Sequence, residues 1–254
     1  MPPRTGTNMR YLILSDIHAN IDALDSVLAA APQTAWDRVV VLGDLVGYGA
    51  EPNEVVGRVR ALDPFLVIRG NHDKAACGID DGSSFNVVAR TAAEWTMGTL
   101  TPDNREYLRQ LPAGPAVVDE AVEICHGTPF DEDHYIFDSE DAARALDAAS
   151  RPLCLFGHTH LPVVFLSHGG RLEGFAPDAA DADVPLEPGV NYLINVGSVG
   201  QPRDGDPRAA FGIYDAAAAS LGLRRVPYPV AKAQRRILDA GLPSSLASRL
   251  GIGR

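Results

Sequence analysis

The order of apolar segments is the feature that most restricts the fold of this chain. In the first third, short apolar or β-branched runs of strand length (residues 10–15, 38–42 and 65–68) alternate with segments whose apolar residues recur at helical spacing (20–31 and 53–62). Strands that alternate with helices form βαβ units, which place parallel strands in one sheet. We therefore predict an α/β protein whose first part is built on parallel strands.

The rest of the chain predicts further helices and strands without an internal repeat. Helices are expected within residues 83–111, at 140–149 and at 230–250; a hairpin at 117–118 and 122–125; and strands at 153–156, 163–167, 192–196, 210–214 and 221–226, the last three antiparallel. Residues 173–189 are rich in Gly, Pro, Asp and Ala and predict a loop, and residues 1–9 predict a flexible tail. No segment is long enough to be a linker between domains, so we expect one domain over residues 1–254.

The charge balance argues against some classes of partner. The 254 residues include 33 Asp and Glu but 22 Lys and Arg, and the formal net charge is −11. Proteins that bind nucleic acid through their general surface carry clusters of Lys and Arg. The basic residues are scattered here, so nucleic acid is not expected as a general partner.

The same composition predicts a cytoplasmic location. No apolar run approaches the roughly 20 residues of a membrane span, and the first residues carry no apolar signal segment. The cysteines (Cys77, Cys125 and Cys154) are too few and too scattered for a disulfide framework, which fits a reducing compartment. We therefore expect no membrane segment.

Histidines follow the predicted strands closely. Of the seven, five come within a few residues of the end of a strand, next to acidic or amide residues: His18, His72, His126, His158 and His160. Ligands of open α/β sheets bind outside the carboxyl ends of the strands. Imidazole nitrogen mixed with carboxylate and amide oxygen, without thiolate, suits Mn, Fe, Zn or Co. This pattern predicts a metal site at that edge of the sheet.

Each of these residues taken singly has a plainer explanation, since an Asp or His at a strand end is often a cap or a buried, hydrogen-bonded core group. Five such clusters in order are hard to explain in that way. Residues i and i+2 of extended backbone point to the same side. We therefore expect Asp16 and His18 to converge on one point, and His158 and His160 likewise.

The ordered motifs resemble those of the calcineurin-like metallophosphoesterases from residue 10 to about residue 215. The resemblance rests on Asp16-x-His18, Gly43-Asp44, Gly70-Asn71-His72-Asp73, His126-Gly127 and Gly157-His158-x-His160. It implies a four-layer α/β/β/α sandwich of two mixed β-sheets flanked by helices, with a dinuclear metal site at the carboxyl ends of the strands. Residues 195–203 are similar to a bacterial branch of small phosphodiesterases, some of which cleave dinucleoside polyphosphates asymmetrically.

The resemblance also implies a role for each site residue. Asp16, His18 and His160 would bind the first metal, and Asn71, His126 and His158 the second; Asp44 would bridge both, and His72 would lie near the leaving group. The metals would be two divalent or trivalent ions of Mn, Fe, Zn or Co. The implied reaction is hydrolysis of a small phosphorylated substrate, either a phosphodiester or a nucleotide-type phosphoanhydride, by a hydroxide that bridges the two metals.

One departure from the family pattern bears on the substrate. Protein phosphatases of this superfamily carry Gly-Asp-x-Val-Asp-Arg-Gly, whereas residues 43–49 here are Gly-Asp-Leu-Val-Gly-Tyr-Gly and lack the second Asp and the Arg. This lowers the case for a Ser/Thr protein phosphatase, which stays an alternative with a phosphomonoesterase. Arg203 is the candidate substitute for the missing phosphate ligand; alternatively it is a solvated turn residue near Asp204.

Two helical lid segments are predicted, at residues 74–111 and 128–150. No motif in them indicates which substrate binds. Tyr135 and Phe137 are candidates for stacking on a nucleobase, with a small satellite core as the alternative. A catalytically silent interaction module, as in the retromer subunit that keeps this fold, is the alternative from another class. The retained His72 and the full ligand set argue against it, and the sequence leaves the oligomeric state open.

Overall fold

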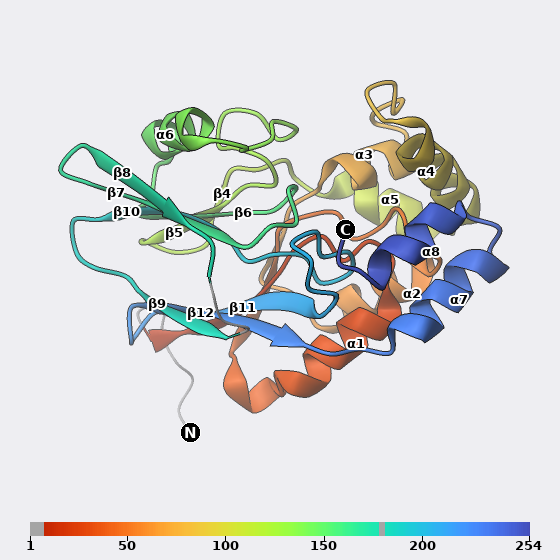
Figure 1. Cartoon of the computed structure of the whole chain (residues 1–254), viewed down its shortest axis with the longest axis horizontal. Helices are drawn as coiled ribbons and strands as arrows, with labels where there is room; N and C mark the ends of the chain where they lie inside the picture. The colour runs from red at the N-terminus through yellow and green to blue at the C-terminus, as the bar shows by residue number, and fades with distance from the viewer. Residues whose placement is uncertain (1–7, 178–180) are drawn as a thin grey trace.

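Two six-stranded mixed sheets lie face to face and are flanked by helices in the computed structural model, which describes residues 8–177 and 181–254 (Figure 1). Helix α1 (Ile21–Ala30) lies on the outer side of the first sheet, and helix α6 (Ser139–Ala148) on the outer side of the second. The predicted α/β/β/α arrangement of two mixed sheets is therefore confirmed. The predicted tail lies outside the described residues over residues 1–7.

The first sheet contains the predicted parallel strands. Its order is β3-β2-β1-β11-β12-β9, with β1 parallel to β2 and antiparallel to β11. Its strands are β1 (Arg10–Leu14), β2 (Arg38–Val41), β3 (Leu66–Val67), β11 (Ala209–Asp215), β12 (Ser220–Val226) and β9 (Ala182–Pro185). Helix α1 joins β1 to β2 and helix α2 (Pro52–Ala61) joins β2 to β3, as the βαβ pattern predicts.

The second sheet also has parallel strands at its centre. Its order is β4-β5-β6-β10-β7-β8, and β5, β6 and β10 are parallel. Its strands are β4 (Ala116–Val117), β5 (Val122–Ile124), β6 (Leu153–Phe156), β10 (Asn191–Asn195), β7 (Val163–His168) and β8 (Arg171–Phe175). The expectation that β10 is antiparallel holds only toward β7, because its other neighbour, β6, runs parallel.

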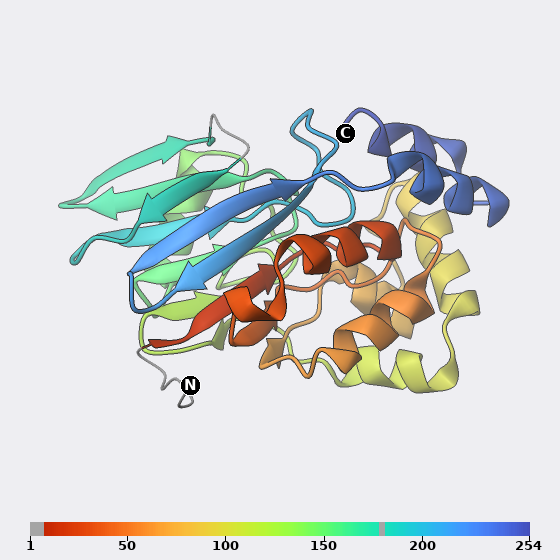
Figure 2. The same ribbon diagram turned by 90° about the horizontal axis from the view of Figure 1, so that it is seen from below.

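The remaining helices gather at one end of the sheets, at the right of Figure 1 and Figure 2. They are α3 (Asn71–Cys77), α4 (Val87–Thr99), α5 (Pro102–Gln110), α7 (Val230–Asp239) and α8 (Ser244–Leu250); a 3₁₀ turn spans Gln33–Ala35. Figure 2 shows β1, in red, running toward this end. The loops that follow the parallel strands are therefore surrounded by helices. Among the described residues, no helix is both long and apolar enough to cross a bilayer.

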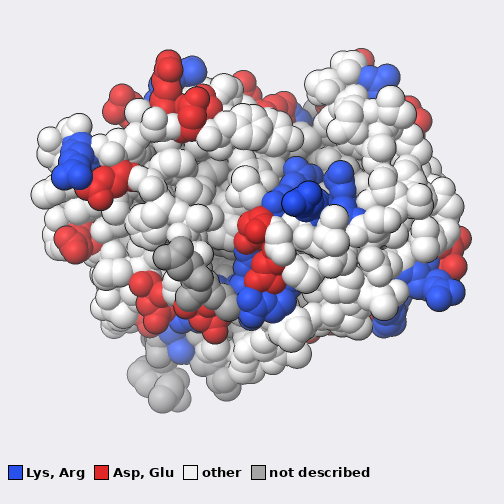
Figure 3. Space-filling view, viewed as in Figure 1, with Lys and Arg blue, Asp and Glu red and all other residues white. Residues whose placement is uncertain are grey.

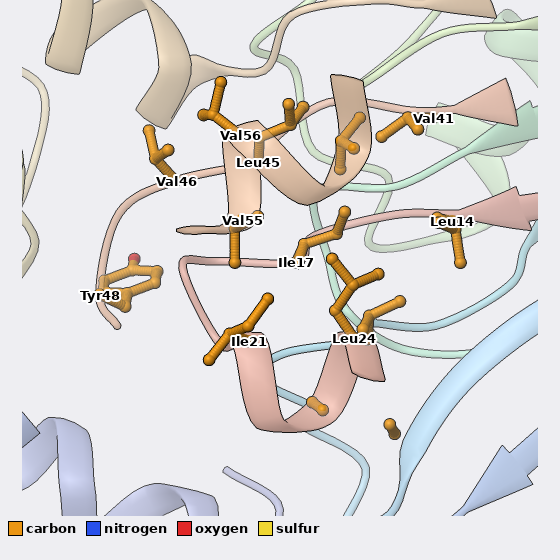
Figure 4. Close-up of a cluster of buried hydrophobic side chains, with 14 of the residues drawn as sticks. Leu14, Ile17, Ile21, Leu24, Val41, Leu45, Val46, Tyr48, Val55 and Val56 are labelled. Atoms are coloured by element: carbon orange, nitrogen blue, oxygen red, sulfur yellow. The ribbon is translucent and has the colours of Figure 1, made fainter. Parts of the chain in front are cut away.

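The strands near the amino terminus are apolar throughout because both of their faces are buried. Tyr11 and Ile13 face the second sheet, whereas Leu12 and Leu14 pack under helices α1 and α2. Figure 4 shows the helix-facing cluster, where Leu14 lies near Leu24 of α1. A side-chain period of two in a strand buried on both faces leaves no polar position, which explains the continuous apolar runs of the sequence.

Two parts of the sequence-based prediction are wrong. Residues 173–189 contain strand residues of β8 and the whole of β9, because these edge strands pair through their backbones and are too exposed to show apolar alternation. Helix α3 was predicted only from residue 74 onward, as the start of the helical segment 74–111, and its first turn was missed. Its signals are short: Asp73 accepts a hydrogen bond from the Gly70 N–H, and Gly78 ends the helix with φ +77°.

A glycine in the loop after β10 allows a close backbone contact at the site end. A Cβ on Gly200 would lie 1.8 Å from the carbonyl oxygen of Ile17, whereas a Cβ on Gly57, in the exposed part of α2, would meet nothing within 4 Å. We expect Gly200→Ala to destabilise the protein by about 2–3 kcal/mol, because backbone must move. Gly57→Ala is the control and should stabilise by about 0.5–1 kcal/mol. Urea denaturation checks both, and equal stability of the two variants would contradict the contact.

Candidate metal centre

Each predicted metal ligand lies just beyond the carboxyl end of a parallel strand. Asp16 and His18 follow β1, Asp44 follows β2, His126 follows β5, and His158 and His160 follow β6, while Asn71 and His72 begin helix α3 after β3. All of these side chains except that of Asn71 are buried, with exposures of 0–3%. Both sheets therefore contribute to one site at the same end of the molecule.

The backbone that carries these ligands is not extended. Asp16, His18, Asp44, His158 and His160 have φ between +49° and +67°, in the left-handed region that residues other than glycine rarely adopt. The alternation of extended backbone is therefore the wrong explanation for the approach of Asp16 and His18. Strained residues cluster at functional sites, where the surrounding structure holds them.

The ligand atoms form two groups that share Asp44. Asp16, His18, Asp44 and His160 each offer one atom within 4.8 Å of the others, and so do Asp44, His126 and His158. The Asn71 Oδ1 atom is 3.2 Å from His126 Nε2 and belongs beside the second group. His158 and His160 thus lie in different groups, contrary to the expectation that they converge on one point.

Backbone carbonyl groups fix which nitrogen of each ring faces inward. The Nδ1 atoms of His18, His126 and His160 are 3.1, 2.8 and 2.6 Å from the carbonyl oxygens of Val46, Leu42 and Gln201, respectively. An Nδ1–H that donates to a carbonyl leaves the Nε2 lone pair free for a metal ion. In His158 the Nε2 atom is instead 3.0 Å from the Asp133 carbonyl oxygen, so Nδ1 keeps the lone pair there.

The inward-facing atoms of the first group fit a cation between them. The Nε2 atoms of His18 and His160 are 3.0 Å apart, and burial lowers the pKa of both rings well below the ordinary value, so two lone pairs face each other. Asp16 Oδ1 is 3.5 Å from His160 Nε2, and Asp44 Oδ2 is 3.5 Å from His18 Nε2. Neutral imidazoles and carboxylates around one point fit a transition-metal ion.

In the second group, too, a buried carboxylate lies next to an imidazole nitrogen. Asp44 Oδ2 is 3.4 Å from His126 Nε2. Burial lowers the pKa of His126, but the Asp44 carboxylate outweighs it and the pKa rises to about 10. A carboxylate as buried as Asp44 is stable only beside positive charge, so the donor set of the second group also fits a metal ion.

His72 lies beside these groups and not within them. Its ring centroid is 4.2 Å from that of Tyr48 and 4.6 Å from that of Phe85, and a Cβ on Gly47 would lie 2.5 Å from its Nδ1 atom. Among the described residues, no partner bonds this buried Nδ1 atom. The imidazole is therefore oriented by packing, and Gly47 leaves room for it where protein phosphatases carry their second Asp.

A cavity of ≈ 250 Å³ adjoins the second group, and both predicted lid segments contribute to its wall. Residues that line it include Tyr48, Asn71, His72, Lys74, Phe85, Asp133, Tyr135 and His158. The ring of Tyr135 stacks on His158 with centroids 3.7 Å apart and on Phe137 with centroids 5.1 Å apart. Phe137 is 75% exposed and Tyr135 is 36% exposed, so Phe137 offers the larger free surface.

Comparison with known proteins agrees with this geometry. The calcineurin-like phosphoesterase superfamily domain matches residues 9–218. The chain belongs to this superfamily. It is therefore a metal-dependent phosphoester hydrolase.

Individual relatives cover nearly the whole chain. A metallophosphoesterase from Sphaerobacter thermophilus is 39% identical, with a TM-score of 0.85 over 97% of this chain and 100% of that one. An uncharacterized protein of Methanocaldococcus jannaschii is 33% identical over 95% of this chain and 97% of its own. A protein of Pyrococcus horikoshii shares the fold, with a TM-score of 0.77 at 21% identity over 96% of this chain and 98% of that one.

Three residues at the site were missed by reasoning from the sequence. Tyr48 packs against both His18 and His72, and Lys74 is a buried cation that pairs with Asp133 at the cavity. Asp73 is buried and accepts hydrogen bonds from the N–H groups of Gly70 and Val46, which ties helix α3 to the loop after β2. Asp73 had a readable signal, since an acidic residue three positions after a helix cap is a capping pattern.

Because Asp44 belongs to both groups, it should control both metals. We expect Asp44→Asn to lose more bound metal than any other single ligand change and to abolish turnover. His126→Ala should lose occupancy of the second metal, while His72→Ala should keep both metals. Elemental analysis of the purified proteins checks this, with circular dichroism as the control for folding. Two metals retained in Asp44→Asn, or equal metal loss in His72→Ala and His126→Ala, would contradict these assignments.

Proposed function

We propose that this enzyme hydrolyses a phosphodiester or a nucleotide-type phosphoanhydride at a two-metal centre. The observation that carries the proposal is the pair of buried donor groups that share the Asp44 carboxylate. The proposed ligands are Asp16, His18, Asp44 and His160 for one ion, and Asp44, Asn71, His126 and His158 for the other. Mn, Fe, Zn or Co suits this mixture of nitrogen and oxygen donors.

The residues of this chain divide into those that hold the ions and those that hold the substrate. Two ions bound here would supply an activated water and neutralise charge on the phosphate group. Backbone carbonyls hold the ligand rings in place, so little reorganisation is needed when the substrate binds. Phosphoryl transfer depends mainly on positioning and charge neutralisation. The fixed ligand rings would supply the positioning, and the bound ions would neutralise the charge.

His72 is the proposed catalytic residue beside the metals. Its Nδ1 atom is buried without a partner among the described residues, and the ring borders the cavity. A substrate whose phosphate lies on the metals would extend its leaving group into that cavity. Burial lowers the pKa of His72 to about 4, so its ring is neutral and can donate a hydrogen bond to the leaving oxygen as a bond to phosphorus breaks.

The cavity favours a small substrate over a protein. Its volume is ≈ 250 Å³, and it is lined by residues of helices α3 and α4 and by the segment around Asp133 and Tyr135. The loop after β2 also lacks the Asp and Arg of the protein phosphatases. We therefore place a Ser/Thr protein phosphatase second. The buried free thiols Cys77, Cys125 and Cys154 support the proposed cytoplasmic location.

A substrate panel tests the function and the role of His72 together. With Mn²⁺ we expect turnover of a chromogenic phosphodiester and of a dinucleoside polyphosphate. His72→Ala should lower kcat by about 10²–10⁴-fold while both metals stay bound. The loss should be larger for a phosphodiester that expels an alcohol than for the chromogenic diester, because a nitrophenol is the more acidic leaving group. His168→Ala, on the exposed end of β7, is the control. Turnover of phosphoprotein alone would refute the proposed substrate class.

Phe137 is the proposed surface for a nucleobase. Its exposed ring can stack on a base, whereas Tyr135 packs against the ligand His158. Base–aromatic stacking contributes about 1–3 kcal/mol, so Phe137→Ala should raise KM for a nucleotide substrate at least fivefold more than KM for the chromogenic diester. Tyr135→Ala should impair both substrates, because it disturbs a metal ligand. Steady-state kinetics on both substrates checks this, and equal effects of Phe137→Ala on both would exclude stacking.

A further inference from the structure

Two arginines from distant parts of the chain converge beside the metal centre. Arg203 lies in the loop after β10, and Arg249 lies in the last turn of α8. Their Nη2 and Nη1 atoms are 3.0 and 3.4 Å from the same oxygen, Gln201 Oε1. Their guanidinium carbons are 5.7 and 6.0 Å from the ring centroid of Tyr48. Two positive charges therefore share one neutral acceptor and one aromatic ring.

Neither arginine has an acidic partner. Over residues 8–177 and 181–254, no carboxylate lies within ion-pair distance of Arg203 or Arg249, whereas Arg69, Arg208 and Arg236 each have at least one. The Nε atom of Arg203 is buried without a hydrogen bond. Burial, and then the charge of Arg203, lower the pKa of Arg249. Like charges held this close without an acid are stabilised by an anion.

The arginine pair is connected to the metal ligands through short contacts. The carbonyl oxygen of Gln201 is 2.6 Å from His160 Nδ1, so the residue that holds both guanidinium groups also positions a metal ligand. The ring of Tyr48 is 4.7 Å from that of His18 and 4.2 Å from that of His72. The ring of Tyr48 thus contacts side chains at the metal centre and also lies close to both guanidinium groups.

Helix α8 is held firmly in this position. Leu246 and Leu250 are buried in the main core. The preceding helix α7 is anchored by Arg236, which pairs with Glu51 and lies 3.1 Å from Asp22 Oδ2. On the face shown in Figure 3, Lys and Arg side chains gather where Figure 1 marks the C-terminus. Arg249 lies beyond residues 9–218, the range that matches the superfamily domain.

We propose that Arg203 and Arg249 together bind a second phosphate group of the substrate, next to the phosphate held at the metal centre. The enzyme would then prefer phosphoanhydrides with at least two linked phosphates over esters that carry one. This inference rests on the proposed function and narrows it. Guanidinium groups bind phosphate through paired, charge-assisted hydrogen bonds. When phosphate binds, the two arginines can exchange their contacts with Gln201 for several stronger hydrogen bonds to phosphate oxygens.

The test compares two substrates in matched variants. For Arg203→Gln and Arg249→Gln, the ratio of kcat/KM for a dinucleoside tetraphosphate to kcat/KM for bis(p-nitrophenyl) phosphate should fall about tenfold to a hundredfold. Arg249→Lys should lose less, because it keeps the charge. Arg235→Gln, on the exposed face of α7, is the control and should leave the ratio unchanged. An unchanged ratio in the Arg203 and Arg249 variants would overturn the proposal, as would equal losses on both substrates, which would place the arginines on the scissile phosphate.

A binding measurement separates this inference from the proposed function. Titration calorimetry at fixed free Mn²⁺ should show tighter binding of tripolyphosphate than of inorganic phosphate, and Arg249→Gln should remove most of that preference. If the wild-type protein hydrolyses neither substrate, the proposed function is wrong, and the calorimetry still decides the arginine site. A preference that survives in both Arg203→Gln and Arg249→Gln would refute the site whatever the activity.

Discussion

The buried carboxylate of Asp44 is the constraint on which the rest of the site depends. Its Oδ1 atom accepts a hydrogen bond from the backbone N–H of His72 at 2.9 Å, and its Oδ2 atom lies 3.4 Å from His126 Nε2 and 3.5 Å from His18 Nε2. A Cβ on Gly70 would lie 2.2 Å from Oδ1. One carboxylate thus joins the ends of β1, β2, β3 and β5, and its buried charge needs positive charge beside it.

The rest of the molecule supplies positive charge locally, although the chain is acidic overall. The formal net charge is −11, which repels anionic substrates at long range. Two metal ions and the guanidinium groups of Arg203 and Arg249 would make one region attractive to phosphate. Because Arg249 is carried by the C-terminal helices, those helices belong to the proposed substrate site as well as to the core.

The sequence predicted much of the fold and the candidate site. Whether a strand could be predicted depended on whether it is buried on both faces or lies at the edge of a sheet. Strands buried on both faces, such as β1 and β2, are continuous apolar runs and were readable. The edge strands β8 and β9 were not, because backbone pairing holds exposed polar residues in a sheet. The approach of Asp16 to His18 was expected for the wrong reason, since the backbone of both residues is in the left-handed region and not extended. This conformation depends on backbone hydrogen bonds to the loop after β2.

By itself, the sequence determined the α/β class, the strand ends that carry His, Asp and Asn, and the chemistry of those donors, because these follow from local periodicity and residue type. Only the tertiary structure decided that packing against Tyr48 and Phe85 orients His72 and that Arg249 meets Arg203. These last features join residues far apart in the chain. Their positions depend on how two sheets and the C-terminal helices pack together, and local pattern carries no record of that packing.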